Sequence, residues 1–463
     1  MDPKENKMGT LPIGKLILNM SLPPMISMLV AALYNVIDSI FVAKISEDAL
    51  AAVTLVFPVQ MLMMSITVGI GVGNASLISR RLGQKRQMDA DSAAAHGILL
   101  GLICWVLYAL FGLFLAGPFL SLYVDPVQNA GIYSMALDYC RIVMMGSAFI
   151  NITVAIERIL QSTGNTLYPM VFNGVAASVN AVLATIFITG EYGMPALGVR
   201  GAGYIAVFGQ MIGCVLALLL FRRGAKRGMN AVSISFKGFR ARGKTLRDIL
   251  AVGAPSIVMM AVQPLLISGL NGILIAYSTT AVAVLGVYFR IQTFVIMPVI
   301  GLNQGALPIM GYNFGARNRV RLTATFKLAF KVAIVIMIVG TAVFWIFPHA
   351  IMGLFNPTPE MLDMGVHALR AISISWIPAS FVIICIGLFQ ALAHGVFALV
   401  ISVVRQLGLI LPLAYFLALY YGVNAAWYSY AIAEISAFTL SLIFLARVRR
   451  QEIAKLPDGA PVK

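Results

Sequence analysis

One carboxylate, Asp38, stands in the first long apolar stretch of the chain, residues 16–42. Tyr34 and Asn35 precede it by four and three residues, so a helix would place all three side chains on one face. An ionised side chain at the centre of a membrane helix costs about 2.5–3.5 kcal/mol on insertion scales, and it is therefore usually paired or functional. Asp38 could exchange a proton or bind Na⁺, or it could be a structural acceptor that holds a neighbouring helix. The residues alone leave both interpretations open.

Four other ionisable residues lie in later apolar stretches. Arg405 and Glu434 fall at similar depth in the last two stretches, which predicts an interhelical ion pair with a structural role. Arg290 and Arg370 also stand in apolar stretches of the second half of the chain. Each could extend to the water interface or line an aqueous cavity.

Methionine is abundant, with 24 residues, and Met259 and Met260 are adjacent in one apolar stretch. Because the methionine side chain is flexible and polarisable, it can line a cavity that adapts to different molecules. Ordinary packing is the simpler interpretation of any single methionine. Both residues are nevertheless candidates for the lining of a substrate cavity.

Motifs typical of enzymes are out of context in this chain. Gly238–Thr245 matches the phosphate-binding loop pattern, but it runs directly into an apolar stretch, which leaves no room for a nucleotide-binding sheet. The four histidines share no ligand spacing, and the four cysteines lie inside apolar stretches without pair spacing. We therefore expect no metal, no cofactor and no disulfide, and a protein that is not an enzyme.

The elements that carry these residues are predicted to be membrane helices. The chain is 60% hydrophobic and 11% charged, with a mean hydropathy of +0.92, whereas soluble proteins carry about 25% charged residues. A stretch of about 20 apolar residues can cross a bilayer, and in lipid it must be a helix because only a helix satisfies its own backbone groups. We predict an all-α integral membrane protein with twelve transmembrane helices: 16–42, 50–78, 92–116, 131–157, 169–190, 201–221, 248–276, 281–310, 322–347, 362–389, 396–418 and 424–446.

Lysine and arginine are distributed unevenly between the two sides of these stretches. One side carries 24 of them, and the other carries only Lys44 and Arg200. This skew follows the positive-inside rule and predicts a multi-pass protein of the cell membrane with both termini in the cytoplasm. The net charge of +16 is then a topology signal. We therefore expect the chain to contact the lipid bilayer and not to bind nucleic acid.

An internal repeat relates the two halves of the chain. Ala49–Gly83 aligns with Ala281–Gly315 without a gap at a constant offset of 232, and the same offset pairs Pro23 with Pro255. Seven aligned pairs are identical: Ala49/Ala281, Ala51/Ala283, Phe57/Phe289, Gln60/Gln292, Gly69/Gly301, Gly73/Gly305 and Gly83/Gly315. Each half contains six stretches, so both halves enter the membrane from the same side. A pseudo-twofold axis along the membrane normal therefore relates them, as in many transporters.

A polar segment, Arg222–Arg247, separates the two halves. We therefore predict two pseudo-symmetric six-helix lobes joined by a linker. The N-terminal lobe covers residues 1–222, the cytoplasmic linker 223–247 and the C-terminal lobe 248–463.

Six short motifs along the chain form a specific combination. They are Pro23-Pro24, Leu33–Val42, Ala49–Val53, Gln161–Thr166, Gly301–Gly305 and Gly311–Ala316. Together they resemble the MATE (multidrug and toxic compound extrusion) family, in particular its DinF/MepA-like bacterial branch. The resemblance implies a multidrug efflux antiporter, driven by H⁺ or Na⁺, that exports drugs or toxic organic cations by alternating access. It also implies that Asp38 is the coupling carboxylate, with Tyr139 and Asn180 in its polar network.

Two positions depart from this resemblance. Many relatives carry an aspartate four residues after Asn180, where this chain has Ala184. The NorM-like branch carries a glutamate where this chain has Gln263. The coupling site therefore has fewer acidic groups than in those relatives.

The expected substrates are small organic molecules, often cationic, and we expect a monomer. The candidate cavity residues are Tyr34, Asn35, Met259, Met260, Gln263 and Arg290. The main alternative is a flippase for a lipid-linked precursor, as in related transporters, which would need a strongly basic cavity. Arg290, Arg370 and Arg405 leave that alternative open, whereas Asp38 argues against it.

Overall fold

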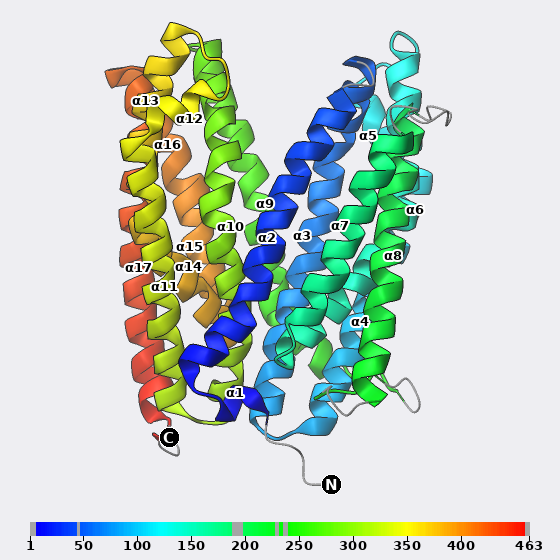
Figure 1. Ribbon diagram of the computed structural model, residues 1–463, viewed down its shortest axis with the longest axis vertical. Helices are drawn as coiled ribbons and strands as arrows, with labels where there is room; N and C mark the ends of the chain where they lie inside the picture. The colour runs from blue at the N-terminus through cyan, green and yellow to red at the C-terminus, as the bar shows by residue number, and fades with distance from the viewer. Residues whose placement is uncertain (1–5, 44–46, 188–197, 227–230, 235–238, 459–463) are drawn as a thin grey trace. The chain divides into compact units, whose positions relative to one another are not determined.

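The computed structural model describes residues 6–43, 47–187, 198–226, 231–234 and 239–458 (Figure 1). The side chains of residues 34–43, 47, 50, 185 and 187 lie outside this description, among them those of the predicted site residues Tyr34, Asn35 and Asp38. All regular secondary structure in the described ranges is helical, which confirms the predicted all-α class.

The helices carry the labels of Figure 1. In the first half they are α1 (Lys7–Thr10), α2 (Ile13–Ala43), α3 (Glu47–Gly83), α4 (Gln87–Leu110), η1 (Phe111–Leu115), α5 (Ala116–Ser121), α6 (Ala130–Ser162), α7 (Leu167–Phe187) and α8 (Gly198–Lys226). In the second half they are α9 (Gly243–Ile275), α10 (Thr279–Gly315), α11 (Arg319–Ile346), α12 (Pro348–Gly353), α13 (Pro359–Ser373), α14 (Trp376–Ala391), α15 (Gly395–Val403), η3 (Val404–Ile410), α16 (Leu411–Tyr421), η4 (Val423–Tyr428), α17 (Ser429–Gln451) and η5 (Ile453–Lys455).

By length and composition, eleven helices among the described residues can cross a membrane. A twelfth span results when α13 and α14 count as one helix bent by 46°. Pro378, in the first turn of α14, accounts for this bend, because proline cannot donate the hydrogen bond that would continue the helix from α13. Each of the twelve predicted stretches corresponds to one of these spans.

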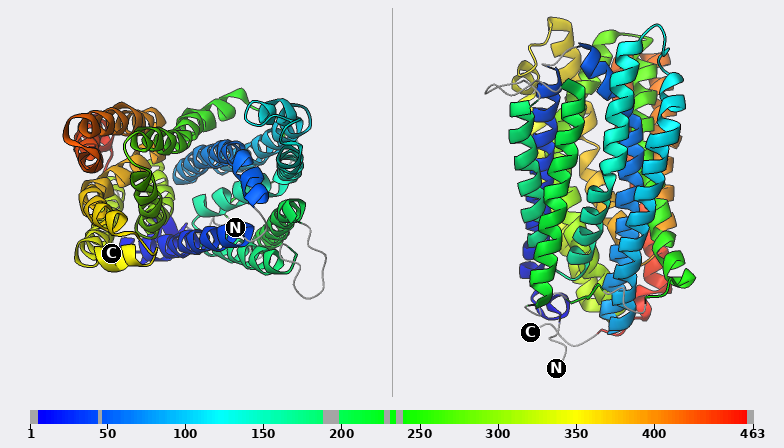
Figure 2. Two further views of the ribbon diagram at one scale, coloured as in Figure 1. Left: turned by 90° about the horizontal axis from the view of Figure 1, so that it is seen from above. Right: turned by 90° about the vertical axis from the view of Figure 1, so that its right-hand side faces the viewer.

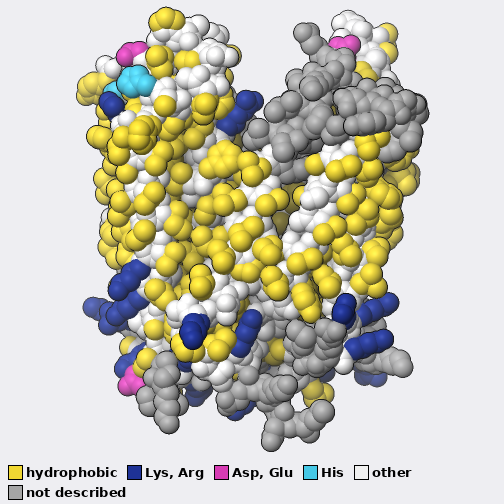
Figure 3. All heavy atoms as spheres, in the orientation of Figure 1, with side chains coloured by type: hydrophobic (Ala, Val, Ile, Leu, Met, Phe, Trp, Pro, Cys, Tyr) yellow, Lys and Arg dark blue, Asp and Glu magenta, His cyan; other side chains and the backbone are white. Residues whose placement is uncertain are grey.

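The surface has the character expected for membrane helices. Hydrophobic side chains cover the middle of the helices, and Lys and Arg side chains gather near one end (Figure 3). The four cysteines, Cys104, Cys140, Cys214 and Cys385, are free and buried. They are apolar packing residues inside the spans.

The helices form two compact units that cross the boundary between the sequence halves. Unit 1 consists of Met1–Met25, Ser79–Lys85 and Val258–Lys463, and unit 2 consists of Ile26–Ile78 and Arg86–Ile257. The first part of α2 therefore packs with the second half of the chain, and the first part of α9 packs with the first half. These units differ from the predicted lobes 1–222 and 248–463 because helix packing does not follow chain order at these segments.

Within unit 2, α8 packs against α6 and α7, and α6 packs against α4 (Figure 2). The first part of α9 approaches α3 very closely in the same unit. A Cβ atom at Gly69 would lie 2.5 Å from Ile257 Cγ1 and 2.7 Å from the Ile257 backbone nitrogen, and one at Gly73 would collide with the Ile249 carbonyl oxygen. Only glycine permits this approach, since backbone atoms cannot rotate away from a Cβ atom.

In unit 1, α10 and α2 make the equivalent contact. Gly301 and Gly305 of α10, the repeat counterparts of those two glycines, lie against α2. Cβ atoms there would stand 2.6 Å from the Cα atoms of Met25 and Ser21. Met25 is 232 residues before Ile257 in the chain. The packing therefore contains the repeat inferred from the sequence, with equivalent helix segments exchanged between the units.

Aromatic side chains fill the centre of unit 1. Tyr288, Phe344 and Trp376 are each no more than 2% exposed. The ring of Trp376 lies 4.7 Å from that of Phe344 and 6.4 Å from that of Tyr288, centroid to centroid. These contacts join α10, α11 and α14 into one core.

Candidate functional site

The predicted coupling carboxylate, Asp38, lies on the part of α2 that belongs to unit 2. The helix runs without a break from Ile13 to Ala43 and contains Pro23 and Pro24 just before it passes from unit 1 to unit 2. Because each proline lacks a backbone N–H donor, the helix has fewer hydrogen bonds at this point. The role of Asp38 stays a prediction, since its side chain is outside the described part.

Tyr139 lies on α6, and its side chain is buried between helices of unit 2. Gln60 of α3 donates a hydrogen bond from Nε2 to the Tyr139 hydroxyl at 3.4 Å. A Cβ atom at Gly203 of α8 would stand 3.3 Å from Tyr139 Cδ2. The position of the phenol ring is therefore set by α3 and α8 together.

Asn180 lies on α7, half-buried, and it packs against Gly209 of the same helix α8. A Cβ atom at Gly209 would stand 3.3 Å from Asn180 Nδ2. Because α8 packs against both α6 and α7, it positions Asn180 as well as Tyr139. Four residues further along α7, Ala184 is 2% exposed in an apolar cluster with Ile205. That position therefore serves packing between α7 and α8.

A row of polar side chains on α3 was not among the predicted site residues. Gln60, Thr67 and Asn74 are spaced by seven residues, about two helical turns, so they share one face of the helix. Thr67 Oγ1 donates to Asn151 Oδ1 of α6 at 2.7 Å, and the Tyr108 hydroxyl of α4 donates to a carbonyl oxygen of α3 at 3.2 Å. The regular spacing of polar residues in an apolar stretch was the signal that could have predicted this row.

The ion pair between Arg405 and Glu434 is present in unit 1. Arg405 Nη1 lies 3.2 Å from Glu434 Oε2 and 3.3 Å from Oε1. Arg405 belongs to the π-helical segment η3, and Glu434 is 5% exposed on α17. Next to the pair, the Tyr288 hydroxyl accepts a hydrogen bond from Trp376 Nε1 at 3.2 Å. Each charge of the pair is compensated by the other, so the arrangement is compatible with the predicted structural role.

The other predicted cavity residues lie on α9 and α10. Gln263, Met260 and Arg290 are exposed, and Met259 is half-buried. Arg370, in the last turn of α13, donates a hydrogen bond from Nη2 to the Trp345 carbonyl oxygen at 3.4 Å. Their part in substrate binding remains a prediction.

The motif Gly311–Ala316 holds the N-terminal helix α1. Arg321 of α11, only 3% exposed, donates from Nη2 to the carbonyl oxygens of Met8 at 3.0 Å and Leu11 at 2.7 Å. Its Nε donates to Asn313 Oδ1 at 3.3 Å, and Asn313 Nδ2 donates to Met8 O at 3.2 Å. Arg321 was not among the predicted site residues, because two of its buried partners are backbone carbonyls that no side-chain pattern reveals.

The same motif contacts the end of α3 inside unit 1. A Cβ atom at Gly83 would collide with the Tyr312 carbonyl oxygen, and one at Gly315 would collide with the Arg80 carbonyl oxygen. Arg80 precedes Tyr312 by 232 residues. The two contacts are therefore related by the pseudo-twofold symmetry of the repeat, as in an interface between two copies of one surface.

Two related halves that span a membrane and exchange equivalent helices define the chain as a membrane transporter. The family model described as MatE matches residues 23–186 and 255–416, so the chain belongs to the MatE family. The two matches begin 232 residues apart, the offset of the repeat. The chain is therefore a multi-pass membrane transporter and not an enzyme.

Known relatives cover nearly the whole chain. The multidrug export protein MepA of Staphylococcus aureus is 24% identical over 444 residues, 95% of each chain. The FAD transporter of Shewanella oneidensis is 26% identical over 407 residues, 87% of this chain and 88% of that protein.

Solved structures of similar transporters have the same fold. A multidrug resistance MATE family transporter in an outward-facing conformation matches with a TM-score of 0.88 and 26% identity, over 97% of this chain and 99% of that one. A MOP superfamily transporter from Pyrococcus furiosus matches with a TM-score of 0.87 and 27% identity, over 98% and 99% of the two chains.

Proposed function

We propose that this protein is an antiporter of the cell membrane that exports small organic molecules, including cationic drugs, in exchange for H⁺ or Na⁺ by alternating access. The family match to both halves of the chain carries this proposal. The similarity to MepA, a protein named for multidrug export, supports drugs as substrates. The uneven distribution of Lys and Arg supports cytoplasmic termini. The protein acts as a monomer in this proposal and uses no bound cofactor besides the coupling ion.

The course of α2 supports Asp38 as the coupling residue. One part of α2 packs in unit 1, and the part that carries Asp38 packs in unit 2. An ion that binds Asp38 therefore acts on a helix that belongs to both units. Coupling requires that the ion bind the two transport states unequally, and a bend near Pro23 and Pro24 would provide such a difference.

An anionic substrate is the second candidate, because one relative is named an FAD transporter. Exposed Arg290 on α10 would suit a phosphate-bearing molecule, since a guanidinium group binds phosphate through two parallel hydrogen bonds. A flippase for a lipid-linked precursor is not favoured, since the relatives are named for drug export and FAD transport.

Transport by the purified protein in liposomes tests the proposal. Ethidium movement is measured under a pH gradient alone and under a Na⁺ gradient alone, with and without FAD as a competitor. We expect one gradient to drive transport, and Asp38→Asn to abolish it. Asp48→Asn, which alters an exposed carboxylate at the start of α3, is the matched control and should transport normally.

Each outcome of this experiment is informative. Wild-type rates in Asp38→Asn at equal expression would refute Asp38 as the coupling site. Ethidium movement that ignores both gradients would refute ion coupling. FAD uptake without ethidium transport would refute a cationic substrate and support an anionic one.

A further inference from the structure

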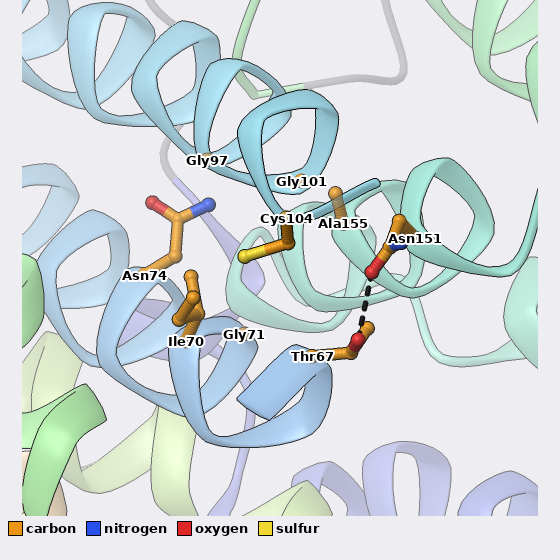
Figure 4. A pocket seen from close by; sticks show the side chains of 9 residues that line it. All are labelled: Thr67, Ile70, Gly71, Asn74, Gly97, Gly101, Cys104, Asn151 and Ala155. Carbon is orange, nitrogen blue, oxygen red and sulfur yellow. Dashed lines mark hydrogen bonds between the residues drawn. The ribbon is translucent and has the colours of Figure 1, made fainter. Parts of the chain in front are cut away.

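A small cavity lies inside unit 2 where α3, α4 and α6 meet (Figure 4). Its polar lining consists of Thr67 and Asn74 of α3, Cys104 of α4 and Asn151 of α6. The space open to the centre of a water molecule is about 10 Å³. A cavity of about this size has room for a single water molecule.

Asn74 is the unusual member of the lining. It is 1% exposed, and neither its Oδ1 nor its Nδ2 has a hydrogen-bond partner among the described residues. Gly97 of α4 creates the space for this amide, since a Cβ atom there would collide with Asn74 Nδ2. Buried polar groups are nearly always hydrogen-bonded, so a partner inside the cavity is expected.

The remaining polar groups of the lining are partly used. Thr67 Oγ1 donates to Asn151 Oδ1 at 2.7 Å, and Asn151 Nδ2 donates to the Ser147 carbonyl oxygen at 2.9 Å. Thr67 Oγ1 also lies 3.5 Å from the Tyr108 hydroxyl. The Asn151 amide oxygen can accept a second hydrogen bond. The Cys104 thiol is a further weak donor and acceptor.

The charge of the lining selects the kind of ligand. All nine residues that line the cavity are neutral. A cation there would be buried without a compensating charge, which is strongly unfavourable. A neutral molecule that both donates and accepts hydrogen bonds fits the amide of Asn74 and the small volume.

We propose that Asn74 binds one internal water molecule at the junction of α3, α4 and α6. The water stabilises unit 2 by joining a polar group of α3 to the neighbouring helices. This site is separate from the proposed ion-coupling residues, and it holds whether or not the protein is an antiporter.

A structure at about 2 Å resolution provides the first test. We expect a density peak about 2.7–3.2 Å from an amide atom of Asn74. No peak at a resolution that shows other internal waters would overturn the proposal. Melting temperatures that rise with Na⁺ but not with K⁺ at constant ionic strength, and only when Asn74 is present, would identify a cation and also overturn it.

A pair of variants provides the second test in the whole protein. Gly101→Ala places a methyl group in the cavity lining, where its Cβ atom stands 3.4 Å from the Asn151 carbonyl oxygen. This methyl should displace the water and lower the melting temperature by about 2–4 °C, although Gly→Ala within a helix is otherwise stabilising. Gly174→Ala on α7, which has no atom within 4 Å, is the matched control and should not destabilise.

The same substitution is then made in Asn74→Leu. Without the amide there is no water to displace, so Gly101→Ala should no longer lower the melting temperature. The two changes are therefore expected to be non-additive. Additive shifts, or a stable Gly101→Ala variant with Asn74 intact, would refute the internal water.

Discussion

The ion pair between Arg405 and Glu434 gives the sharpest test of the architecture of unit 1. Glu434→Gln leaves the Arg405 guanidinium without its partner inside the protein. Breaking a fully buried pair costs about 3–5 kcal/mol. The side chains here are 20% and 7% exposed, so the pair is not fully buried and the lower end of this range applies. We expect a loss of about 3 kcal/mol, which corresponds to roughly 6–12 °C in melting temperature for a unit of this size.

The buried cysteines make this loss measurable in each unit. A thiol-reactive dye labels a buried cysteine only when the surrounding helices open. A variant that keeps only Cys385 reports on unit 1, which contains the ion pair, and one that keeps only Cys140 reports on unit 2. Glu434→Gln should lower the temperature at which Cys385 becomes labelled more than the temperature at which Cys140 becomes labelled.

The double variant Arg405→Met with Glu434→Leu separates a structural role from a functional one. Replacing a buried pair by apolar residues of similar volume is often neutral or stabilising. We therefore expect the double variant to melt near the wild-type temperature and to transport normally. A stable double variant without transport would refute the structural role, and an unchanged melting temperature in Glu434→Gln would refute the energetic argument.

Three further predictions concern the contacts around α1 and the end of α10. Gly315→Ala should abolish stable expression, because its Cβ atom would collide with the Arg80 backbone. Gly286→Ala on the same helix, where no atom lies within 4 Å of the added Cβ, should be tolerated. Equal melting curves for the two variants would refute the close approach. Arg321→Met removes three hydrogen bonds, each charge-assisted and contributing about 1.5–3 kcal/mol, so amide hydrogen exchange in α1 should accelerate more than tenfold. Burial lowers the pKa of Lys7 below its ordinary value of 10.5, so the ammonium form opposes docking of α1; exchange in α1 should slow as the pH rises toward 10.5 after correction for the intrinsic rate, and Lys7→Met should slow it at neutral pH.

Much of the fold follows from the sequence because lipid leaves few alternatives. An apolar stretch of sufficient length must be a helix in a membrane, so the twelve spans could be predicted one by one. The Arg405–Glu434 pair was predictable for a similar reason, since two opposite charges at one depth on consecutive helices have few other partners. The bend between α13 and α14 falls next to Pro378, a proline inside the predicted span 362–389 that can kink its helix.

The exchange of α2 and α9 between the units could not be read from the sequence. The repeat pairs Gly69 with Gly301 and Gly73 with Gly305, but no local pattern shows which helix packs against these glycines. Arg321 was missed for a related reason, since its partners are backbone carbonyls distant in the chain. The burial of Asn74 could not be predicted either, because it depends on Gly97 of another helix.

The two exchanged helices differ in their capacity for ion coupling. The repeat makes α2 and α9 equivalent, and each passes between the units at the same position, after Met25 and after Ile257. Beyond that point α2 carries Asp38, whereas the aligned residue of α9 is Leu270, which is 2% exposed in unit 1. A bound ion can therefore change the energy of α2 but has no ionisable group to act on at the equivalent position of α9. Under our proposal, the asymmetry of ion coupling arises from a difference at one position in two otherwise equivalent crossing helices.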